Sequence, residues 1–511
     1  MPDSDFAVYT HENKSYHKLK DKYPEAPNFM REKEHRSITI NMLLNMIKGT
    51  MGVVFPLITF PYVSRVLGVD ALGQYNFASS IVSYFIMIAE LGISTYAIRS
   101  GAGYRDNRNK LNTFVSETFT INALTTCASY ILLFIFLRYA GNIEGKTLVL
   151  VLALQILFKT ISVEWIYSIF EDYLFITVRS IIFQFVSLIL MFILVRSQED
   201  VIWYAAITVI SSAGTGLLGL FHAYKYCTIH LTAHPNIKTH MKPIMVFFAT
   251  SLAVLIYVNS DMTLLGLISG SYSVGIYSVS AKVYTLLKNI LASAIVVSIP
   301  RMSTLWEKHE IEEFQHLGSD IYDIFLTLVI PVIVGIILLN KEIVILIAGA
   351  EFLQARDSLT ILSIALFFCL GAGFWSQGVL IPQNEEKTVF KITMLSAVIN
   401  IVLNCVLIPL FQERAAAITT VVAEATVFLY CRHKGRKSQN FKSKWNILCK
   451  IIIGCIPMLL INLVIKQFIA AEWLVAILTM VFCVPSYFWI EYKLANKTVV
   501  KYWEKARHKK R

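Results

Sequence analysis

Long apolar runs alternate with short polar segments along almost the whole chain. Each run is about 20 residues long, the length that a helix needs to cross the hydrocarbon core of a membrane. Strands of a membrane barrel would be about ten residues long and would alternate in polarity, which these runs do not. The pattern therefore predicts an all-α integral membrane protein with fourteen spans, at 41–64, 73–97, 113–137, 147–170, 173–195, 200–222, 243–268, 274–299, 320–340, 357–381, 387–409, 413–431, 447–465 and 472–492.

The overall composition supports a membrane protein. Charged residues make up 16% of the 511 residues, whereas an average soluble domain has roughly 25%. Such scarce charge does not cover the surfaces of an ordinary cytosolic enzyme, and the 56% of hydrophobic residues excludes a disordered chain. The sequence has no Walker A loop and no GxSxG motif. We therefore expect neither an ATP-driven pump nor a hydrolase, and more generally no enzyme.

Cysteine and histidine give no metal or catalytic pattern. The eight cysteines fall in predicted spans or on the predicted inner face, and they lack the spacing of a metal site. Because none lies in an outer loop, we expect no disulfide. Ten of the eleven histidines lie in tails or loops. We therefore expect no cofactor.

The distribution of basic residues predicts the orientation in the membrane. Of the 46 Lys and Arg residues, 31 fall in one set of alternating loops and the termini, eight in the opposite loops, and seven within spans. Lys and Arg favour the cytoplasmic side, so both termini are predicted to be cytoplasmic. Residues 1–36 lack the apolar stretch of a signal peptide and predict a polar cytoplasmic extension, and residues 493–511 predict a basic cytoplasmic tail.

A short internal repeat divides the chain into halves. Gly68, Gly73 and Tyr75 in one predicted outer turn recur as Gly270, Gly275 and Tyr277 in another, at a constant offset of 202. Each turn follows the first span of a set of six and precedes the second. Substrate sites of many transporters lie between such repeats. We therefore predict three units around or beside a central cavity: an N-lobe over 37–222, a C-lobe over 243–431, and two additional helices over 447–492.

Basic residues inside the spans are the candidate substrate-binding groups. Charges within a membrane are costly and usually face a partner or an aqueous path. Lys48, Lys282 and Lys288 lie on the first two spans of a repeat, where the lobes are expected to face each other, and Arg65 lies at the predicted outer mouth. Ammonium groups in a cavity attract phosphate. The alternative for each residue is a structural ion pair between helices.

Three acidic residues, Glu90, Glu164 and Asp261, also lie within predicted spans. Each is a candidate for ion coupling, with H⁺ or Na⁺ as the ion, or for pairing with a buried base. Lys282 and Lys288 are six residues apart, about 240° around an ideal helix, and cannot both point to one spot. We therefore expect at least one of them to pair with Asp261 or Glu90, and Lys159 is a candidate partner of Glu164.

With these residues in place, the chain resembles the Wzx-type polysaccharide flippases of the multidrug/oligosaccharidyl-lipid/polysaccharide exporter superfamily. The resemblance covers about residues 38–495. It implies two six-helix bundles that open alternately to each face of a bacterial inner membrane. The matching stretches are FPYVSRVLGVDALGQYNFASS, EWIYSIFEDYLFITVRS, DMTLLGLISGSYSVGIYSVSAKV and INIVLNCVLIPLFQERAAAITTVVAE.

The resemblance implies a polyprenyl-pyrophosphate-linked oligosaccharide as the substrate, exported for a surface polysaccharide. A polysaccharide polymerase and glycosyltransferases are then the expected protein partners, and no motif indicates nucleic acid. Two other classes stay open. A drug or cation antiporter of the same superfamily would favour an acidic cavity, and a scaffold protein would anchor glycan-synthesis enzymes through its basic loops.

Overall fold

The computed structural model describes residues 38–139, 141, 144–438 and 445–508. The predicted extension over 1–36 and the last three residues of the predicted tail lie outside these residues.

All secondary-structure elements of the described chain are helices, and it contains no strand. The elements are α2 (Ile38–Glu90), α3 (Ile93–Gly101), η2 (Ala102–Tyr104), α4 (Arg108–Tyr139), α5 (Lys146–Ile161), α6 (Glu164–Ile169), α7 (Tyr173–Leu194), η3 (Gln198–Asp200), α8 (Val201–Ala223), α9 (Ile237–Ser269), α10 (Ser271–Val296), α11 (Ile299–Glu307), α12 (Ile311–Leu338), α13 (Asn340–Ala348), η4 (Ala350–Phe352), α14 (Ala355–Gly373), η5 (Phe374–Leu380), α15 (Glu386–Ser438), α16 (Trp445–Phe468), α17 (Glu472–Lys493) and α18 (Lys497–His508).

The predicted all-α membrane architecture is confirmed. By length and composition, eleven helical segments of the described chain can cross a membrane. Two of them exceed 50 residues and contain a break, at Gly68 (φ 71°) in α2 and at Gln412 (φ 50°) in α15. Each half of α2 and α15 is long enough to span on its own. With these halves counted separately and the more polar α10 included, the described residues contain fourteen spans.

The two turns of the internal repeat pack directly against each other. A Cβ atom on Gly73 would lie 1.9 Å from the carbonyl oxygen of Ser271, and one on Gly275 would lie 2.1 Å from that of Val69. Val69 and Ser271, like Gly73 and Gly275, are separated by the repeat offset of 202. The contact is therefore reciprocal, as two-fold related helices would make it. We call this end of the molecule the turn end.

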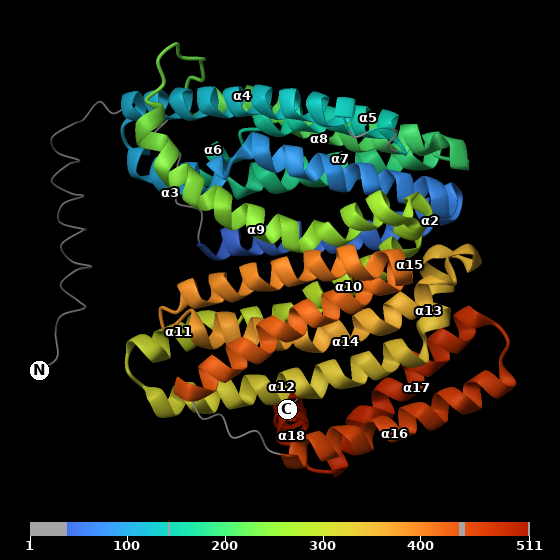
Figure 1. Ribbon diagram of the computed structural model, residues 1–511. Coiled ribbons are helices and arrows are strands. Elements are labelled where there is room, and N and C mark those ends of the chain that lie inside the picture. The colour runs from blue at the N-terminus through green and yellow to red at the C-terminus, as the bar shows by residue number, and fades with distance from the viewer. Residues whose placement is uncertain (1–37, 140, 142–143, 439–444, 509–511) are drawn as a thin grey trace, which may run out of the picture.

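The buried apolar residues form one shared core at the turn end and two separate cores at the opposite end. The shared core joins Leu67 and Leu133 of the first half to Val274 and Leu359 of the second. At the opposite end, one core lies among α3, α4, α6 and the end of α8, and another among α11, α12, α14 and α16. Figure 1 shows the two stacked helix groups, with α2, α9, α10 and α15 along their boundary. The start of α9 adds Ile244 to the core of the first half at the opposite end, so there the second half reaches the first half through α9.

The C-terminal helices lie on the outer side of the second half. α16 and α17 pack against each other, α16 also contacts α12, and α17 contacts α13 (Figure 1). Most of the predicted basic tail is the helix α18, which contacts α12 and α17. The residue bounds of the two predicted lobes stay a prediction.

Candidate functional site

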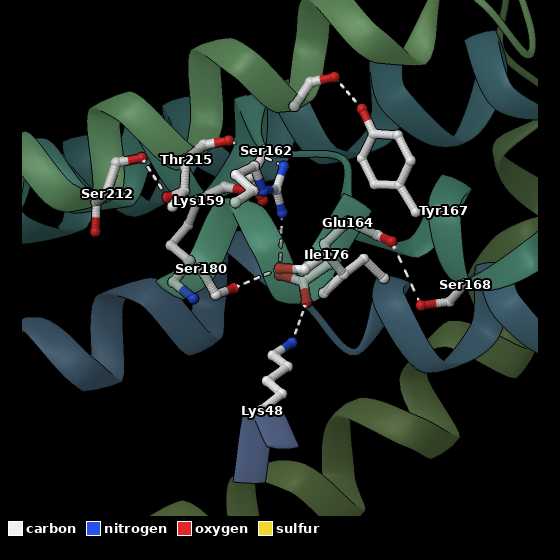
Figure 2. Close-up of polar contacts among 12 residues, drawn as sticks. Lys48, Lys159, Ser162, Glu164, Tyr167, Ser168, Ile176, Ser180, Ser212 and Thr215 are labelled. Carbon is white, nitrogen blue, oxygen red and sulfur yellow. Dashed lines mark hydrogen bonds and ion pairs between the residues drawn. The ribbon is translucent and has the colours of Figure 1, made fainter. Parts of the chain in front are cut away.

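Glu164 connects three helices near the opposite end of the first half. Its carboxylate accepts a hydrogen bond from Lys48 Nζ on α2 at 2.7 Å and lies 3.7 Å from Arg179 Nη2 on α7. Figure 2 shows Lys48 reaching this carboxylate from α2. Val163, with a left-handed backbone (φ 39°), separates α5 from α6 and places Glu164 in the first turn of α6. A β-branched residue rarely adopts this conformation, which is often found at functional sites.

The two cations that contact Glu164 have different environments. The Arg179 side chain is 2% exposed, donates to the carbonyl of Thr215 at 3.0 Å, and lies against the rings of Tyr167 and Phe175. The Lys48 side chain is 38% exposed, and Glu164 is its partner. Arg179 therefore holds the carboxylate within the first half, whereas Lys48 can exchange Glu164 for another anion at a smaller cost in buried contacts. Lys159, the candidate partner of Glu164 from the sequence, makes no ion pair with Glu164 among the described residues.

A cavity of about 220 Å³ lies beside Glu164. Glu90 and Lys159 both line it, and neither side chain makes a hydrogen bond or an ion pair with a described residue. Asn122 lies in its wall and donates to the carbonyl of Ala89 at 2.8 Å. We call this space the N-lobe pocket. Its lining residues are Glu90, Ile93, Ser94, Ile98, Asn122, Lys159, Ser162, Glu164, Trp165 and Ser168.

Asp261 on α9 lies in a second polar cluster, in the other half of the molecule. Its carboxylate accepts hydrogen bonds from Asn400 (3.1 Å) and Asn404 (2.6 Å) on the first half of α15. Thr420 on the second half of α15 donates at 2.6 Å, and Tyr277 on α10 donates at 3.0 Å. All four donors are neutral. The expected pairing of a lysine with Asp261 or Glu90 is therefore wrong: among the described residues, neither carboxylate has a basic partner.

The residues around Asp261 were missed by sequence reasoning. Asn400 and Asn404 are four residues apart on an otherwise apolar helix, which places both amides on one face. Thr419 and Thr420 follow on the second half of α15, where Thr419 donates to Asn404 Oδ1 at 2.6 Å. Polar side chains at such spacing inside an apolar span were the available signal. It says where the polar face is but not which carboxylate it meets.

The two lysines on α10 point to different neighbours, as their spacing requires. Lys288 Nζ lies 3.9 Å from Glu424 on α15 and 5.8 Å from the centroid of the Tyr284 ring. Lys282 Nζ lies 5.7 Å from the ring centroid of Phe60 on α2. Among the described residues, Lys282 has no carboxylate partner. It is thus a cation without a carboxylate partner where α10 faces α2. At a rise of 1.5 Å per residue, it lies roughly 17 Å along α10 from Ser271 at the turn end.

Arg65 lies at the turn end, where the predicted outer mouth would be. Its guanidinium donates to the carbonyl oxygens of Leu346 (2.5 Å) and Ile345 (3.3 Å). These carbonyls belong to the last turn of α13, where a cation is favourable because the helix dipole and free carbonyls point to it. Ser64 also donates to the neighbouring carbonyl of Ile347 at 3.1 Å. Arg65 therefore joins α2 to α13 in this structure.

Comparisons with known proteins agree with the helical architecture. A family model described as "Polysaccharide biosynthesis protein" matches residues 36–306. The chain is 21% identical over 395 residues to a protein from Shigella dysenteriae named as an O-antigen transporter, covering 76% of this chain and 98% of that protein.

Two solved structures have a similar fold. A structure titled "Lipid II flippase MurJ, inward closed conformation" matches with a TM-score of 0.73 and 17% identity, over 90% of this chain and 100% of that one. An inward-facing multidrug resistance transporter of the MATE family matches with a TM-score of 0.60 and 14% identity, over 79% of this chain and 100% of that one.

Proposed function

This chain belongs to the polysaccharide biosynthesis protein family, and we propose that it moves a polyprenyl-pyrophosphate-linked oligosaccharide across a membrane by alternating access. The protein is a multi-pass membrane protein and a transporter rather than an enzyme. Relatives named as O-antigen transporters support a glycan-bearing substrate. The proposed direction is from the inner to the outer leaflet.

Lys282 is the observation that carries the proposal. It is an ammonium group at the boundary between the halves, and among the described residues it has no anionic partner. Lys282 is half-buried, and a charge within a membrane span that has no partner is costly, so an anion from the substrate would relieve that cost. A pyrophosphate supplies such an anion while the polyprenyl chain stays in lipid. Lys48 is the second proposed contact, because its bond to Glu164 is half-exposed.

The arrangement of the cores supports alternating access. The halves share an extensive apolar core at the turn end, whereas at the opposite end the two cores are separate and, among the described residues, α9 is the element of the second half that reaches the core of the first. If the basic loops are cytoplasmic, as the Lys and Arg distribution predicts, this arrangement is closed to the outside. Both termini are then cytoplasmic, in a bacterial inner membrane. A polymerase and glycosyltransferases of the same polysaccharide are the proposed protein partners.

Asp261 is the proposed site of the coupling ion. A buried carboxylate with only neutral donors keeps an uncompensated charge, which a bound proton or Na⁺ would remove. Rotation of the Asn400 or Asn404 amide by half a turn would present its oxygen to a cation. Binding of the ion would then change the contacts among α9, α10 and both halves of α15. Ion binding would thereby bias the packing of the second half of the molecule.

The test is export of surface polysaccharide by a Lys282→Ala strain. We expect export to be lost while the amount of protein in the membrane stays normal. Lys282→Arg should retain part of the activity, because it keeps the positive charge. The control is Lys387→Ala, which removes an exposed lysine from the start of α15. Normal export by Lys282→Ala would remove Lys282 from the mechanism.

The same strains separate flipping from drug transport. The MATE-like fold is compatible with a drug antiporter, but likeness of fold does not determine the substrate. Overexpression that raises drug tolerance while polysaccharide export stays independent of the protein would favour the antiporter. Export that requires the protein, together with unchanged drug tolerance, would favour the flippase.

A further inference from the structure

The N-lobe pocket has the chemistry of a carbohydrate subsite, and we infer that it binds one sugar ring of the substrate glycan. The inference rests on the proposed function. It adds a site that recognises the sugar, separate from Lys282, the proposed contact of the phosphate. The pocket is bordered by Glu164, the partner of Lys48. A sugar in the pocket would therefore lie next to the proposed phosphate contact at Lys48.

The polar groups of the pocket include both donors and acceptors. Glu90 is an acceptor and Lys159 a donor, and neither is bonded to a described residue. Ser94, also without a bonded partner among the described residues, can do either. A pyranose presents hydroxyl groups that both donate and accept, so such a mixed lining matches it. The hydrogen bonds to Glu90 and Lys159 would be charge-assisted, which makes them the stronger ones.

The apolar part of the lining matches the faces of a sugar ring. Ile93 and Ile98 on α3 and Trp165 on α6 complete the wall. The whole Trp165 residue is 4% exposed, so its indole is fixed by packing. Ile93 is likewise almost fully buried, whereas Ile98 is 38% exposed. Ile98 therefore offers most of the apolar surface on which the C–H face of a pyranose can pack while its hydroxyls reach the polar groups.

Charge and size argue against other ligands of this pocket. Glu164 in the lining is already paired with Lys48 and Arg179, and the other two charged groups, Glu90 and Lys159, have opposite signs, so the carboxylate of Glu90 disfavours a phosphate. The ammonium of Lys159 likewise disfavours a cationic drug. The volume of about 220 Å³ is below the roughly 300–1,000 Å³ that drug-sized ligands occupy. A single sugar ring is the ligand class that fits both limits.

The experiment compares binding of bare and glycosylated lipids to the full-length protein in detergent. The probes are a short-chain polyprenyl pyrophosphate and four versions that carry one hexose, N-acetylhexosamine, deoxyhexose or uronic acid. We expect at least one glycosylated lipid to bind about tenfold more tightly than the bare lipid, the effect of one charge-assisted hydrogen bond. Equal affinity for all five lipids would overturn the inference and leave the proposed function standing.

Variants then locate the preference. Glu90→Ala and Ser94→Leu should reduce the affinity for the preferred glycosylated lipid to that of the bare lipid, without changing bare-lipid binding. Lys282→Ala should weaken both lipids by the same factor. A variant of either pocket residue that weakens both lipids equally would contradict the sugar subsite, provided that its thermal unfolding is unchanged. Failure of every lipid to bind the wild-type protein would instead reject the proposed function, and the subsite with it.

Glu90→Gln distinguishes the sugar subsite from a proton site. The amide can still hydrogen-bond a hydroxyl but cannot carry a proton. Retained sugar preference with lost transport would assign Glu90 to ion coupling, and the subsite would then rest on Ser94→Leu. Loss of the preference in Ser94→Leu supports the subsite in either case, and its retention there contradicts it.

Discussion

Gly73 lies so close to Ser271 that a Cβ atom on the glycine would be 1.9 Å from the serine carbonyl oxygen. Backbone cannot yield to a methyl group as a flexible side chain can, so the helices themselves must separate. We predict that Gly73→Ala destabilises closure of the turn end by about 1–3 kcal/mol, the usual cost of overpacking. The measurement is the yield of thiol cross-linking in a Glu144→Cys, Ser271→Cys pair in a background without native cysteines.

The matched control for this prediction is Gly52→Ala on the same helix, because a Cβ atom there would have no neighbour within 4 Å. We expect Gly52→Ala to leave the cross-linking yield unchanged. Gly275→Ala should act like Gly73→Ala, since a Cβ atom on Gly275 would lie 2.1 Å from the carbonyl oxygen of Val69. Equal yields in all three variants would show that the contact does not control closure.

The two cations of Glu164 predict unequal effects on stability. Removal of Lys48 breaks a half-exposed ion pair, so Lys48→Met should change the free energy of unfolding by less than about 1 kcal/mol. Glu164→Gln removes the carboxylate near the buried Arg179, and an uncompensated buried charge should cost more, about 2–4 kcal/mol. Thermal unfolding of the purified proteins would compare them. A larger loss for Lys48→Met would mean that Lys48, rather than Arg179, depends on Glu164 for stability.

The positions of the helices follow from the apolar pattern. The predicted span 173–195 is α7 (Tyr173–Leu194), and the predicted span 472–492 is α17 (Glu472–Lys493). In a membrane the length of an apolar run is set by the thickness of the bilayer, so tertiary packing changes these bounds little. The repeat offset likewise identified Gly73 and Gly275 at the contact between the halves.

The partners of the intramembrane charges could not be predicted in the same way. Which group a side chain meets depends on how each helix is rotated about its axis, and packing sets that rotation. Asp261 is therefore bonded to Asn404, which is 143 residues away in sequence, rather than to a lysine. Glu164 likewise contacts Lys48 and Arg179, although Lys159 is nearer in sequence. Spacing along one helix restricts which residues share a face but not what that face meets.

The cluster around Asp261 predicts a specific change in ion dependence. Asp261→Asn keeps a polar side chain of the same size, so the protein should fold, but the side chain can no longer bind a proton or attract Na⁺. We expect transport in vesicles to lose its response to a Na⁺ or pH gradient. Glu386→Gln, an exposed change at the start of α15, should keep that response. A response to the same gradient in Asp261→Asn would place the coupling site elsewhere.

Glu144, between α4 and α5, predicts how closure of the turn end depends on pH. Its carboxylate accepts hydrogen bonds from the backbone N–H of Ser271 (3.0 Å) and from the Ser271 hydroxyl, and these bonds lower the pKa of Glu144 below its usual value of 4.5. A carboxyl whose pKa is lower in the closed form stabilises that form while it is ionised. The contribution is therefore complete above about pH 4.5 and is lost as the pH falls through the lowered pKa.

The measurement needs a second pair of cysteines across the turn end, because the Glu144→Cys, Ser271→Cys pair removes Glu144 itself. With Glu144 in place, the yield of cross-linking should fall as the pH falls below 4.5. Glu144→Gln should show a lower yield at neutral pH and a weaker pH dependence, whereas the same decline in both proteins would assign the dependence to another group.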